Sequence, residues 1–403
     1  MKTSRRSFLM TGAAAVGAAR MARGQSPNDR IGVALVGCGN RGGDRLRAFM
    51  RLSEKHNLAC VALCDVWKKN LAAMADSVEK AAGYRPKTFT RYADVLALPE
   101  VDCVIITTPD FAHSPILIDA AEAGKHAYVE KPMAVRLEDA RAAVDTVEAS
   151  GIVCQVGTQK RSEGPHIASA KLIQEGVLGT MIKAYTSYVR NVPSWKRSYS
   201  DVRREEVDWE QFLMYLPEQE FDARKFRCWH LYRDLCHGLI GLLGVHPIDV
   251  AHWYTDDPLP DSAVGLEAAR VWTDREHADT QECTFEYPKG HLLQFTGRLG
   301  NANDGAQNVF YGSRGTFDTA TWTATGDGGV EKDRIQEPIK VEPAPTTSHM
   351  ENWVICMREN NRATNAPVQA GYAHSVASIL GAQACARGTR LVYDHQHRTI
   401  KEG

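Results

Sequence analysis

The chain has 403 residues, of which 48 are Lys or Arg and 49 are Asp or Glu, so its formal net charge is −1. This balance, without a long basic run, argues against a nucleic acid as a partner. A hydrophobic content of 43% is ordinary for a soluble globular protein, and the length exceeds one typical hydrophobic core, so we expect two domains. The ten cysteines include no C-x-x-C pair, and no metal site is predicted.

Residues 1–24 are predicted to be a twin-arginine signal peptide. Arg5 and Arg6 precede a short apolar run, and small residues before position 25 suit cleavage after Gly24. The apolar run is shorter than the ~20 residues that a membrane span needs. A disordered basic tail is the alternative. We therefore expect the twin-arginine export machinery as a partner, a periplasmic or exported location, and no membrane attachment after cleavage.

Cleavage would remove five basic and no acidic residues, which changes the formal net charge from −1 to −6. Several cysteines lie in or beside apolar, strand-like runs, and we interpret them as small buried residues and not as a disulfide framework. These cysteines are Cys38, Cys60, Cys64, Cys103 and Cys154.

Residues 31–36, IGVALV, are predicted to form a buried strand, and they lead directly into a glycine-rich turn. The turn has the pattern G-x-G-x-x-G, formed by Gly37, Gly39 and Gly42 with Asn40 and Arg41 between them. In a dinucleotide-binding turn, the first Gly allows the bend, the second lets backbone approach a pyrophosphate, and the third lets helix pack on strand. Glycine turns of this kind also occur for packing reasons alone.

The second apolar run, residues 58–64, ends at Asp65. A carboxylate at that strand end can accept hydrogen bonds from both ribose hydroxyls of an adenosine. The alternative is that Asp65 caps a helix beginning near Trp67. Together, the strand, turn, helix, strand and acid favour dinucleotide binding.

Apolar runs alternate with helical patterns through residues 30–157, which predicts a Rossmann domain with a doubly wound parallel sheet. The expected strands are 31–36, 58–64, 101–107, 126–129 and 152–156, and the expected helices are 42–54, 67–82, 114–123 and 137–149.

Residues 158–345 are predicted to form a second α/β domain with a mostly antiparallel open sheet. We expect a helix at 165–175 and strands at 181–189, 263–272, 280–287, 291–299 and 307–311. Residues 190–225 are interpreted as a loop that lines a cleft, or alternatively as a surface loop, and 323–346 as an exposed loop. Residues 346–403 are expected to be helical over 348–388 and to pack back near the first domain.

The strand at 126–129 is followed by Glu130, Lys131 and Pro132, at the same sheet edge as the glycine turn. A lysine at this place can hold a substrate hydroxyl and stabilise negative charge that develops on its oxygen. The alternative is a surface lysine that pairs with Glu130.

These motifs resemble those of the Gfo/Idh/MocA oxidoreductases, and the resemblance covers nearly the whole chain after residue 24. The matching elements are the glycine turn, Asp65, the Thr-Pro-x-x-x-His run that ends at His113, Glu130-Lys131-Pro132, and Gln155 to Gln159 with Arg161.

The resemblance implies that Thr107, Pro109 and His113 lie along the nicotinamide half of a bound NAD. It places Glu130 and Lys131 beside nicotinamide and sugar, with a cis bond before Pro132.

It also implies that Gln159 faces the cleft from the domain junction. Asp65 would favour NAD over NADP because a carboxylate repels a 2′-phosphate. Lys68 and Lys69 nearby weaken that inference, so NADP stays possible.

The resemblance further implies that His246 is the general base. Leu242 stands where the family often carries an aspartate, and a base histidine normally needs a polar partner. Asp249, one helical turn on, could serve, and Asp234 and His237 are other candidates. The alternative for His246 is a buried structural histidine.

The function that follows is oxidation of a sugar or polyol hydroxyl by hydride transfer to a tightly bound NAD. The alternatives are an NAD-dependent glycosidase, an epimerase or lyase that uses transient oxidation, and a non-catalytic sugar-binding homologue. The family's open sheet face often pairs with a partner, so we expect a homo-oligomer.

Overall fold

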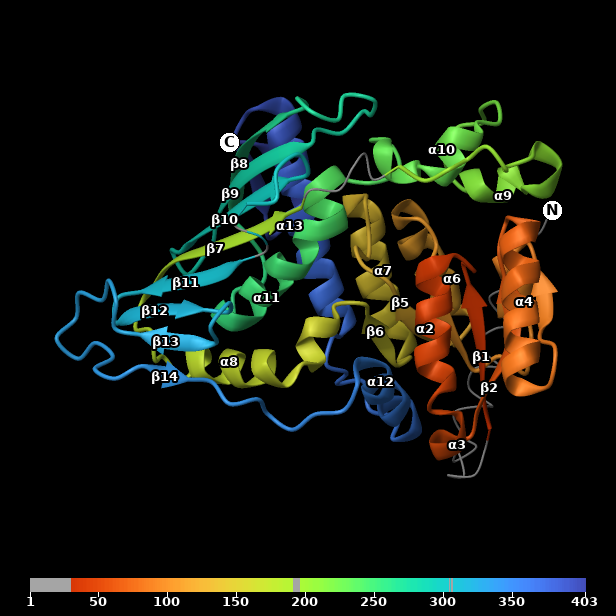
Figure 1. The fold of residues 1–403 in the computed structure, drawn as a ribbon, viewed down its shortest axis with the longest axis horizontal. Helices are drawn as coiled ribbons and strands as arrows, with labels where there is room; N and C mark the ends of the chain where they lie inside the picture. The colour runs from red at the N-terminus through yellow and green to blue at the C-terminus, as the bar shows by residue number, and fades with distance from the viewer. Residues whose placement is uncertain (1–29, 191–195, 304, 306) are drawn as a thin grey trace, which may run out of the picture.

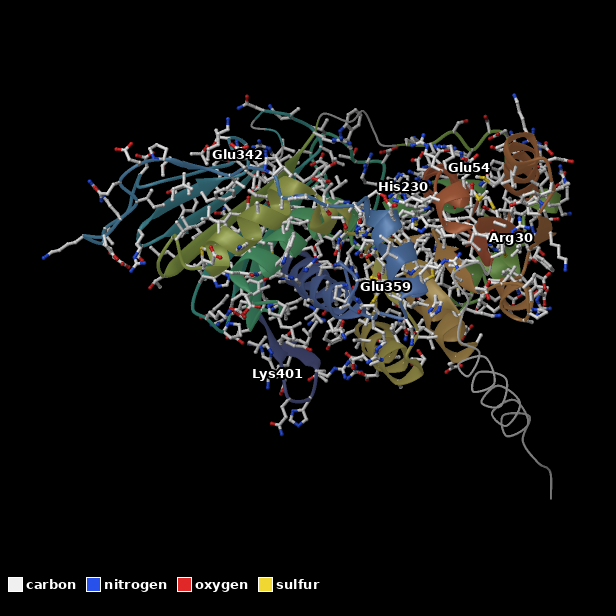
Figure 2. All side chains as sticks on the ribbon, turned by 90° about the horizontal axis from the view of Figure 1, so that it is seen from below. Arg30, Glu54, His230, Glu342, Glu359 and Lys401 are labelled. Atoms are coloured by element: carbon white, nitrogen blue, oxygen red, sulfur yellow. The ribbon has the colours of Figure 1, made fainter. Side chains whose placement is uncertain are left out.

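The computed structural model describes residues 30–190, 196–303, 305 and 307–403, so the predicted signal peptide at 1–24 lies outside the described residues. Two sheets with their helices form two domains that lie side by side (Figure 1). In the perpendicular view of Figure 2, Lys401 lies on the second domain, away from Arg30 and Glu54 on the first. This architecture confirms the predicted fold class.

The first sheet is parallel throughout and has the strand order β3-β2-β1-β4-β5-β6. The order reverses between β1 and β4, which is where ligands bind in doubly wound sheets. Each predicted strand of this domain is present with ends within two residues, and a short edge strand, β3, was not predicted. The strands are β1 Ile31–Val36, β2 Leu58–Cys64, β3 Lys87–Phe89, β4 Cys103–Ile106, β5 His126–Val129 and β6 Cys154–Val156.

Helices cover both faces of this sheet because its strands are apolar on both sides. In β1, Val33 and Leu35 face one core with α2 and α4, whereas Ala34 and Val36 face the other with α6 and α7. The helix expected from residue 42 begins at Asn40 and ends at Met50. The helices are α2 Asn40–Met50, α3 Ser53–His56, α4 Lys68–Ala82, α5 Tyr92–Leu96, α6 His113–Glu122 and α7 Leu137–Ser150.

The second sheet has ten strands in the order β14-β13-β12-β11-β7-β10-β9-β8-β15-β16. Every pairing described in it is antiparallel except that of β7 with β10, which confirms a mostly antiparallel sheet. The strands are β7 Met181–Val189, β8 Ser262–Ala268, β9 Thr280–Glu286, β10 Leu292–Arg298, β11 Asn308–Gly312, β12 Gly315–Asp318, β13 Thr323–Thr325, β14 Ile339–Lys340, β15 Leu391–Asp394 and β16 Thr399–Glu402.

Four expectations for this part of the chain need correction. The loop expected at 323–346 contains β13 and β14, and the strand expected at 263–272 ends at Ala268. The end of the chain is not only helical, since β15 and β16 extend the second sheet at its β8 edge. The helical region expected at 348–388 is two helices, α12 His349–Arg358 and α13 Val368–Arg387, with Pro367 immediately before the second.

One face of the second sheet is covered by α8 Gly164–Gln174, α11 Val245–Thr255 and α13 (Figure 1). Its opposite face carries exposed apolar side chains that cross-strand register places on the same side. These are Val264 and Leu266 in β8, Leu292 in β10 and Tyr311 in β11. Among the described residues, no helix has the length and apolar character that a membrane span requires.

The irregular segment expected at 190–225 crosses from the second domain to the first; its residues 191–195 are not described. It contains two short helices, α9 Trp209–Leu213 and α10 Ala223–Arg227, which lie above α4 in Figure 1. Asp208 N donates to Val66 O at 2.8 Å, and the rings of Trp67 and Phe226 meet edge to face at 5.9 Å. We call residues 196–233 the strap because they cover the carboxyl end of β2.

All ten cysteines are buried free thiols, which confirms the interpretation of those in the apolar runs.

Helix α12 of the C-terminal region packs against the first domain. Trp353 in α12 is fully buried, its ring lies 6.1 Å from that of Phe49 and 5.8 Å from that of Tyr128, and its Nε1 donates to Val153 O. The helix therefore completes the hydrophobic core on one face of the Rossmann sheet.

We expect Trp353→Ala to lower the free energy of unfolding by about 3–5 kcal/mol, because it leaves a large cavity in this core. Urea unfolding followed by circular dichroism measures the change. Val330→Ala is the control, since Val330 is 83% exposed and its truncation should cost less than about 0.5 kcal/mol. Equal stability of the two variants would contradict the packing role of α12.

Candidate active site

The glycine turn between β1 and α2 contains two glycines required by packing and one that faces free space. A Cβ on Gly37, whose φ is +97°, would lie 2.7 Å from the Thr107 backbone, and one on Gly42 would lie 2.0 Å from Gly37 O. A Cβ on Gly39 would meet no atom within 4 Å. Thr107 Oγ1 donates to Gly37 O at 2.7 Å, and this hydrogen bond stabilises the glycine turn.

The start of α2 is suited to an anion. Gly39 is its N-cap and supplies no side-chain cap, and the first turn contains no acidic residue. The backbone N–H groups and the helix dipole therefore favour a phosphate there. Arg41 projects from the first turn with its side chain 48% exposed, and its Nε lies 3.8 Å from Glu130 Oε1. Free space at Gly39 and this uncapped helix end fit the pyrophosphate of a dinucleotide.

Asp65 is tied to the turn and to the next helix at the same time. Its Oδ2 accepts a hydrogen bond from Cys38 N at 2.7 Å, and its Oδ1 accepts one from Trp67 N at 2.8 Å. Burial raises the pKa of Asp65 to about 6, although both backbone donors oppose the shift. Asp65 lies two residues before Trp67, which is the N-cap of α4 and has no side-chain cap, so the carboxylate holds the turn before the helix and does not cap it.

Lys68 and Lys69, which weakened the preference for NAD, are both engaged by the strap. Lys68 Nζ donates to Glu205 O at 3.1 Å, and Lys69 Nζ donates to Asp201 at 2.6 Å. Both contacts are exposed, and they hold the two ammonium groups toward the strap.

Lys131 connects the two domains. The peptide bond before Pro132 is cis, as the resemblance implied, and Lys131 Nζ donates to Leu242 O at 2.5 Å. Leu242 lies in a π-helical segment, Ile240–Gly244, a form that is frequent at functional sites. Burial lowers the pKa of Lys131, and the nearby Asp110 and Glu130 carboxyls oppose that shift.

Glu130 is not the surface partner that the alternative required. It is only 3% exposed, its Oε1 accepts from Gln159 Nε2 at 3.3 Å, and it lies 3.7 Å from Arg45 Nε. Gln159 also donates to the Tyr128 hydroxyl at 2.8 Å, so both residues belong to a polar group beneath Lys131.

His246 follows Leu242 by one helical turn, at the start of α11, and is half-buried. Burial lowers the pKa of His246 well below its usual value, and the cations Lys131, Lys160 and Arg41 lower it further. A neutral imidazole can accept a proton, which is what a general base must do. The structure brings Lys131 and His246 to the same place, at the sheet edge where α2 begins.

Asp249 does not play the part expected of it as hydrogen-bonding partner of His246. Its carboxylate is bound by Arg161, with Nε at 2.8 Å and a terminal nitrogen at 3.0 Å, and it lies 3.8 Å from His374. Arg161 is the main reason that the pKa of Asp249 lies below its usual value despite burial. The alternative candidate Asp234 pairs with Lys225 Nζ at 2.6 Å.

Both ring nitrogens of His113 face backbone carbonyls, and its place along the nicotinamide stays a prediction. Nδ1 lies 2.7 Å from Pro132 O and Nε2 lies 2.9 Å from Thr108 O, and the residue is 1% exposed. The two acceptors favour a protonated ring, but burial dominates and the pKa of His113 is lowered. His113 thus links the loop after β4 to the turn after β5 through its two ring nitrogens. Pro109 begins that loop's short helical turn, Asp110–Ala112.

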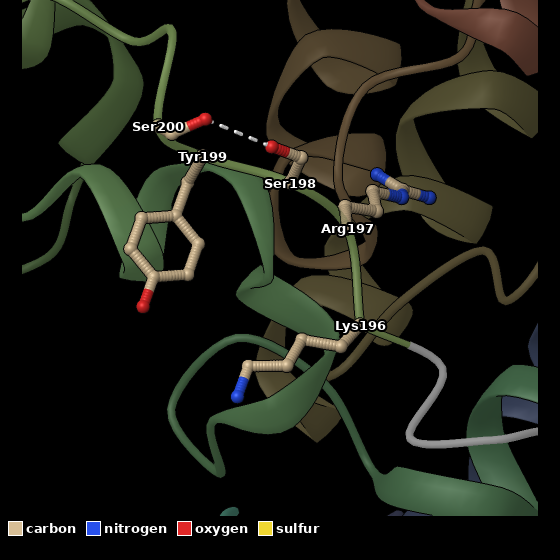
Figure 3. A pocket seen from close by; sticks show the side chains of 5 residues that line it. All are labelled: Lys196, Arg197, Ser198, Tyr199 and Ser200. Atoms are coloured by element: carbon tan, nitrogen blue, oxygen red, sulfur yellow. Dashed lines mark hydrogen bonds between the residues drawn. The ribbon is translucent and has the colours of Figure 1, made fainter.

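Two residues near the site were given no role in the sequence reasoning. Arg161 appeared only as part of a motif, and Asp110 was passed over although it follows a buried strand at the ligand-binding edge of the sheet. A separate pocket of about 420 Å³ is lined by residues 196–200 of the strap, and Figure 3 shows its lining.

We expect Gly39→Ala to leave stability within about 1 kcal/mol of the natural chain but to weaken NAD binding at least about tenfold, because a methyl group there occupies the space for the pyrophosphate. Titration of NAD by calorimetry and thermal unfolding measure the two effects. Gly42→Ala is the matched control: its Cβ would clash with Gly37 O, so it should lose stability first. Unchanged NAD affinity in Gly39→Ala would count against this location of the pyrophosphate.

We expect Arg161→Met to lower the free energy of unfolding at pH 7 by about 3–5 kcal/mol, because it leaves the buried Asp249 charge unpaired. The pKa of Asp249 is depressed in the folded chain, so the stability from this pair is present above its ordinary value of 3.8 and is lost as the pH falls below it. Urea unfolding from pH 7 to pH 3 should show the two proteins converging at acid pH. The control is Arg161→Met with Asp249→Asn, which should recover part of the loss at pH 7.

Comparison with known proteins agrees with this geometry. Residues 31–158 match the family model described as an oxidoreductase family with an NAD-binding Rossmann fold, and residues 166–318 match the GFO/IDH/MocA C-terminal domain.

The match covers less than half the length of each of the two curated relatives described here. A glycosyl hydrolase family 109 protein of Shewanella baltica is 29% identical over 168 residues, which is 41% of this chain and 36% of that protein. A scyllo-inositol 2-dehydrogenase (NAD(+)) of Bacillus subtilis is 30% identical over 162 residues, 40% of this chain and 45% of that protein.

A solved structure extends the likeness of the fold to both domains. An aldose-aldose oxidoreductase of Caulobacter crescentus, complexed with glycerol, superposes with a TM-score of 0.67 at 20% identity and covers 90% of this chain and 100% of its own. With both of its domains matched, the chain belongs to the Gfo/Idh/MocA oxidoreductase family and carries an NAD-binding Rossmann domain.

Proposed function

We propose that this protein is an oxidoreductase that removes hydride from a hydroxyl-bearing carbon of a sugar or polyol and uses a tightly bound NAD. The observation that carries the proposal is the convergence of Lys131 and His246: Lys131 Nζ bonds Leu242 O at 2.5 Å, one helical turn before His246. This point lies at the carboxyl end of the parallel strands, beside the glycine turn.

The residues that would hold the cofactor are on the first domain. The backbone around Gly39 and the start of α2 would take the pyrophosphate, and Asp65 would take the ribose of the adenosine. NAD, when bound, supplies the hydride acceptor. The engagement of Lys68 and Lys69 by the strap supports NAD over NADP.

The chain's own catalytic groups divide the remaining work. His246, kept neutral by burial and by three neighbouring cations, takes the proton of the substrate hydroxyl. Lys131 donates to the same oxygen and stabilises the negative charge that develops on it. Both carboxylate oxygens of Asp249 accept from Arg161, so we assign Asp249 to positioning the start of α11 and not to proton transfer.

Tight retention of the cofactor is supported by the strap. Asp208 N bonds Val66 O, Trp67 and Val207 form a β-bridge, and the Arg227 guanidinium lies 4.9 Å from the Trp67 ring centroid. Release of a ligand from the end of β2 would require these contacts to open. Retention matters for an exported enzyme because no pool of free NAD outside the cytosol would replace a lost cofactor.

Export through the twin-arginine machinery to the periplasm rests on residues 1–24 and is part of this proposal, as is assembly into a homo-oligomer. The exposed apolar side chains Val264, Leu266, Leu292 and Tyr311 on the uncovered sheet face support assembly.

A second candidate is a net redox-neutral reaction, in which a transient ketone permits glycoside cleavage, elimination or epimerisation. The likeness to a glycosyl hydrolase family 109 protein favours glycoside cleavage among these. A non-catalytic sugar-binding homologue is favoured only by Leu242 in the aspartate position, and the retained Lys131 and His246 speak against it.

We expect Lys131→Ala to reduce the rate of hydride transfer by about 10²–10⁴-fold, because the developing oxyanion loses its charged donor. The measurement is absorbance of reduced nicotinamide after a panel of sugars and polyols is added to cofactor-loaded protein, with product identification. Lys171→Ala, an exposed lysine on α8 paired only with Glu175, is the control and should behave as the natural chain does. Undiminished transfer in Lys131→Ala would refute the role given to Lys131.

A further inference from the structure

The turn after β5 that carries Lys131 is held by two side chains of α13, a helix that lies far along the chain. Met133 N donates to His374 Nε2 at 3.3 Å, across 241 positions, and Ala134 N donates to Ser375 Oγ at 3.1 Å. Both side chains on α13 are fully buried. The mechanism so far gives neither contact a task.

The carbonyl groups of the same turn are held by α6. His113 Nδ1 lies 2.7 Å from Pro132 O, and Ser114 Oγ donates to Met133 O at 2.6 Å. Backbone groups buried in a turn must find partners within the fold, because water does not reach them. Four side chains from two helices therefore define the backbone of residues 132–134, directly after Lys131.

Helix α13 can approach the turn closely because it carries a glycine on the same face. Gly371 lies one helical turn before His374 and Ser375. A Cβ on Gly371 would lie 2.7 Å from Met133 Sδ and 2.9 Å from Val156 Cγ2. A side chain at this position would hold the helix away from the turn and lengthen both hydrogen bonds.

The hydrogen bond to Met133 also defines where the proton of the His374 ring lies. A backbone N–H can only donate, so Nε2 is the acceptor, and the neutral ring carries its proton on Nδ1. Nδ1 faces Asp249, whose Oδ1 lies 3.8 Å away. Burial lowers the pKa of His374, Asp249 opposes the shift, and the Arg161 guanidinium adds to it, in agreement with a neutral ring.

Asp249 connects this contact to the helix that carries His246. It lies one helical turn after His246 in α11, and Arg161 holds its carboxylate with two hydrogen bonds. The contacts run from α11 through Asp249 to His374, and from His374 to the turn that carries Lys131. The two proposed catalytic groups are therefore joined through the ring of His374.

We propose that His374 is a positioning residue: through its hydrogen bond to the turn it sets where the Lys131 ammonium lies relative to His246. The inference rests on the proposed function, since the separation of the two groups matters only if they act on one substrate hydroxyl. Lys131 Nζ already gives one proton to Leu242 O, so a shift of the turn would move the remaining donors away from the developing oxyanion. A misplacement of about 1 Å can cost about a hundredfold in rate.

Two polar variants that differ by one methylene group test the proposal. The side chain of His374→Asn ends near the place of Nδ1 and does not reach the turn, whereas that of His374→Gln extends to the place of Nε2 and offers an oxygen to the Met133 N–H. The first readout is the rate at which acetic anhydride acetylates Lys131 at a fixed pH, quantified by mass spectrometry in cofactor-loaded protein. In His374→Asn we expect Lys131 to react at least about threefold faster, because a loosened turn releases its amine from Leu242 O. His374→Gln should stay close to the natural rate.

The second readout is turnover of any sugar or polyol that reduces the cofactor. We expect kcat of His374→Asn to fall by about 10–100-fold with KM changed less than about threefold, because orientation is lost and binding is not. His374→Gln should recover most of kcat. Equal acetylation of Lys131 in His374→Asn and the natural chain would overturn the proposal. Equal defects in the two variants would also overturn it, because the effect would then come from loss of the imidazole and not of the hydrogen bond.

His126→Leu is the matched control. His126 Nδ1 accepts a hydrogen bond from Val153 N at 2.9 Å, which is the same kind of contact, but His126 begins β5 and Lys131 follows its other end. Its loss should cost stability without changing the acetylation of Lys131. If His374→Asn does not fold, hydrogen exchange in the natural chain decides: a protected Met133 amide supports the hold on the turn, and one that exchanges as fast as an exposed loop contradicts it.

Acetylation and hydrogen exchange need no turnover. Failure of every sugar and polyol to reduce the cofactor would defeat the proposed function, while faster acetylation in His374→Asn would still show that His374 holds the turn. Unchanged acetylation would defeat the positioning role alone.

Discussion

The hydrogen bond from Lys131 Nζ to Leu242 O joins the first domain to the second at the candidate active site. Lys131 follows β5 of the parallel sheet, and Leu242 lies in the π-helical segment that leads into α11 of the second domain. A buried ammonium is tolerated only where acceptors and opposite charge surround it. The two domains therefore meet around a charge at this point, and α13 also contacts α7 of the first domain.

The cations gathered at this junction also determine the charge state of His246. Lys131, Lys160 and Arg41 all act on His246 in the same sense as burial does, and only Asp249 opposes them. Because Arg161 offsets most of the Asp249 charge, the imidazole stays neutral without a direct acidic partner. Leu242 contacts Lys131 through its backbone carbonyl, a group that any residue at this position would supply.

The sequence was informative wherever the signal was local. The run from Ile31 to Gly42 predicted strand, turn and helix correctly, since each step depends on residues a few positions apart. Strands β3 and β14 were missed because they are short and weakly apolar, and β15 and β16 because they are stabilised by an edge of β8 more than 120 residues away.

The site was predictable in its members but not in their partners. Lys131 and His246 could be named from motifs, yet the pairing of Asp249 with Arg161 joins residues 88 positions apart, and the carbonyl contacts of His113 depend on how the turn after β5 is shaped. A hydrogen-bonding side chain can be assigned from spacing only when its partner lies on the same element. Asp249 was one helical turn from His246, which made that pairing attractive, but a bidentate guanidinium outcompetes a neutral imidazole for a buried carboxylate.

The strap contacts both the proposed adenosine end of the cofactor site and the charged groups near Lys131. It leaves the second sheet after β7, bonds Val66 beside Asp65, and brings Arg197 into the electrostatic surroundings of Asp110. Arg197 is itself destabilised as a cation by burial and by Arg227, which lowers its pKa. Arg197 acts on Asp110 and Arg227 acts on Asp65, so the strap brings positive charge to two buried acids at the carboxyl edge of the first sheet.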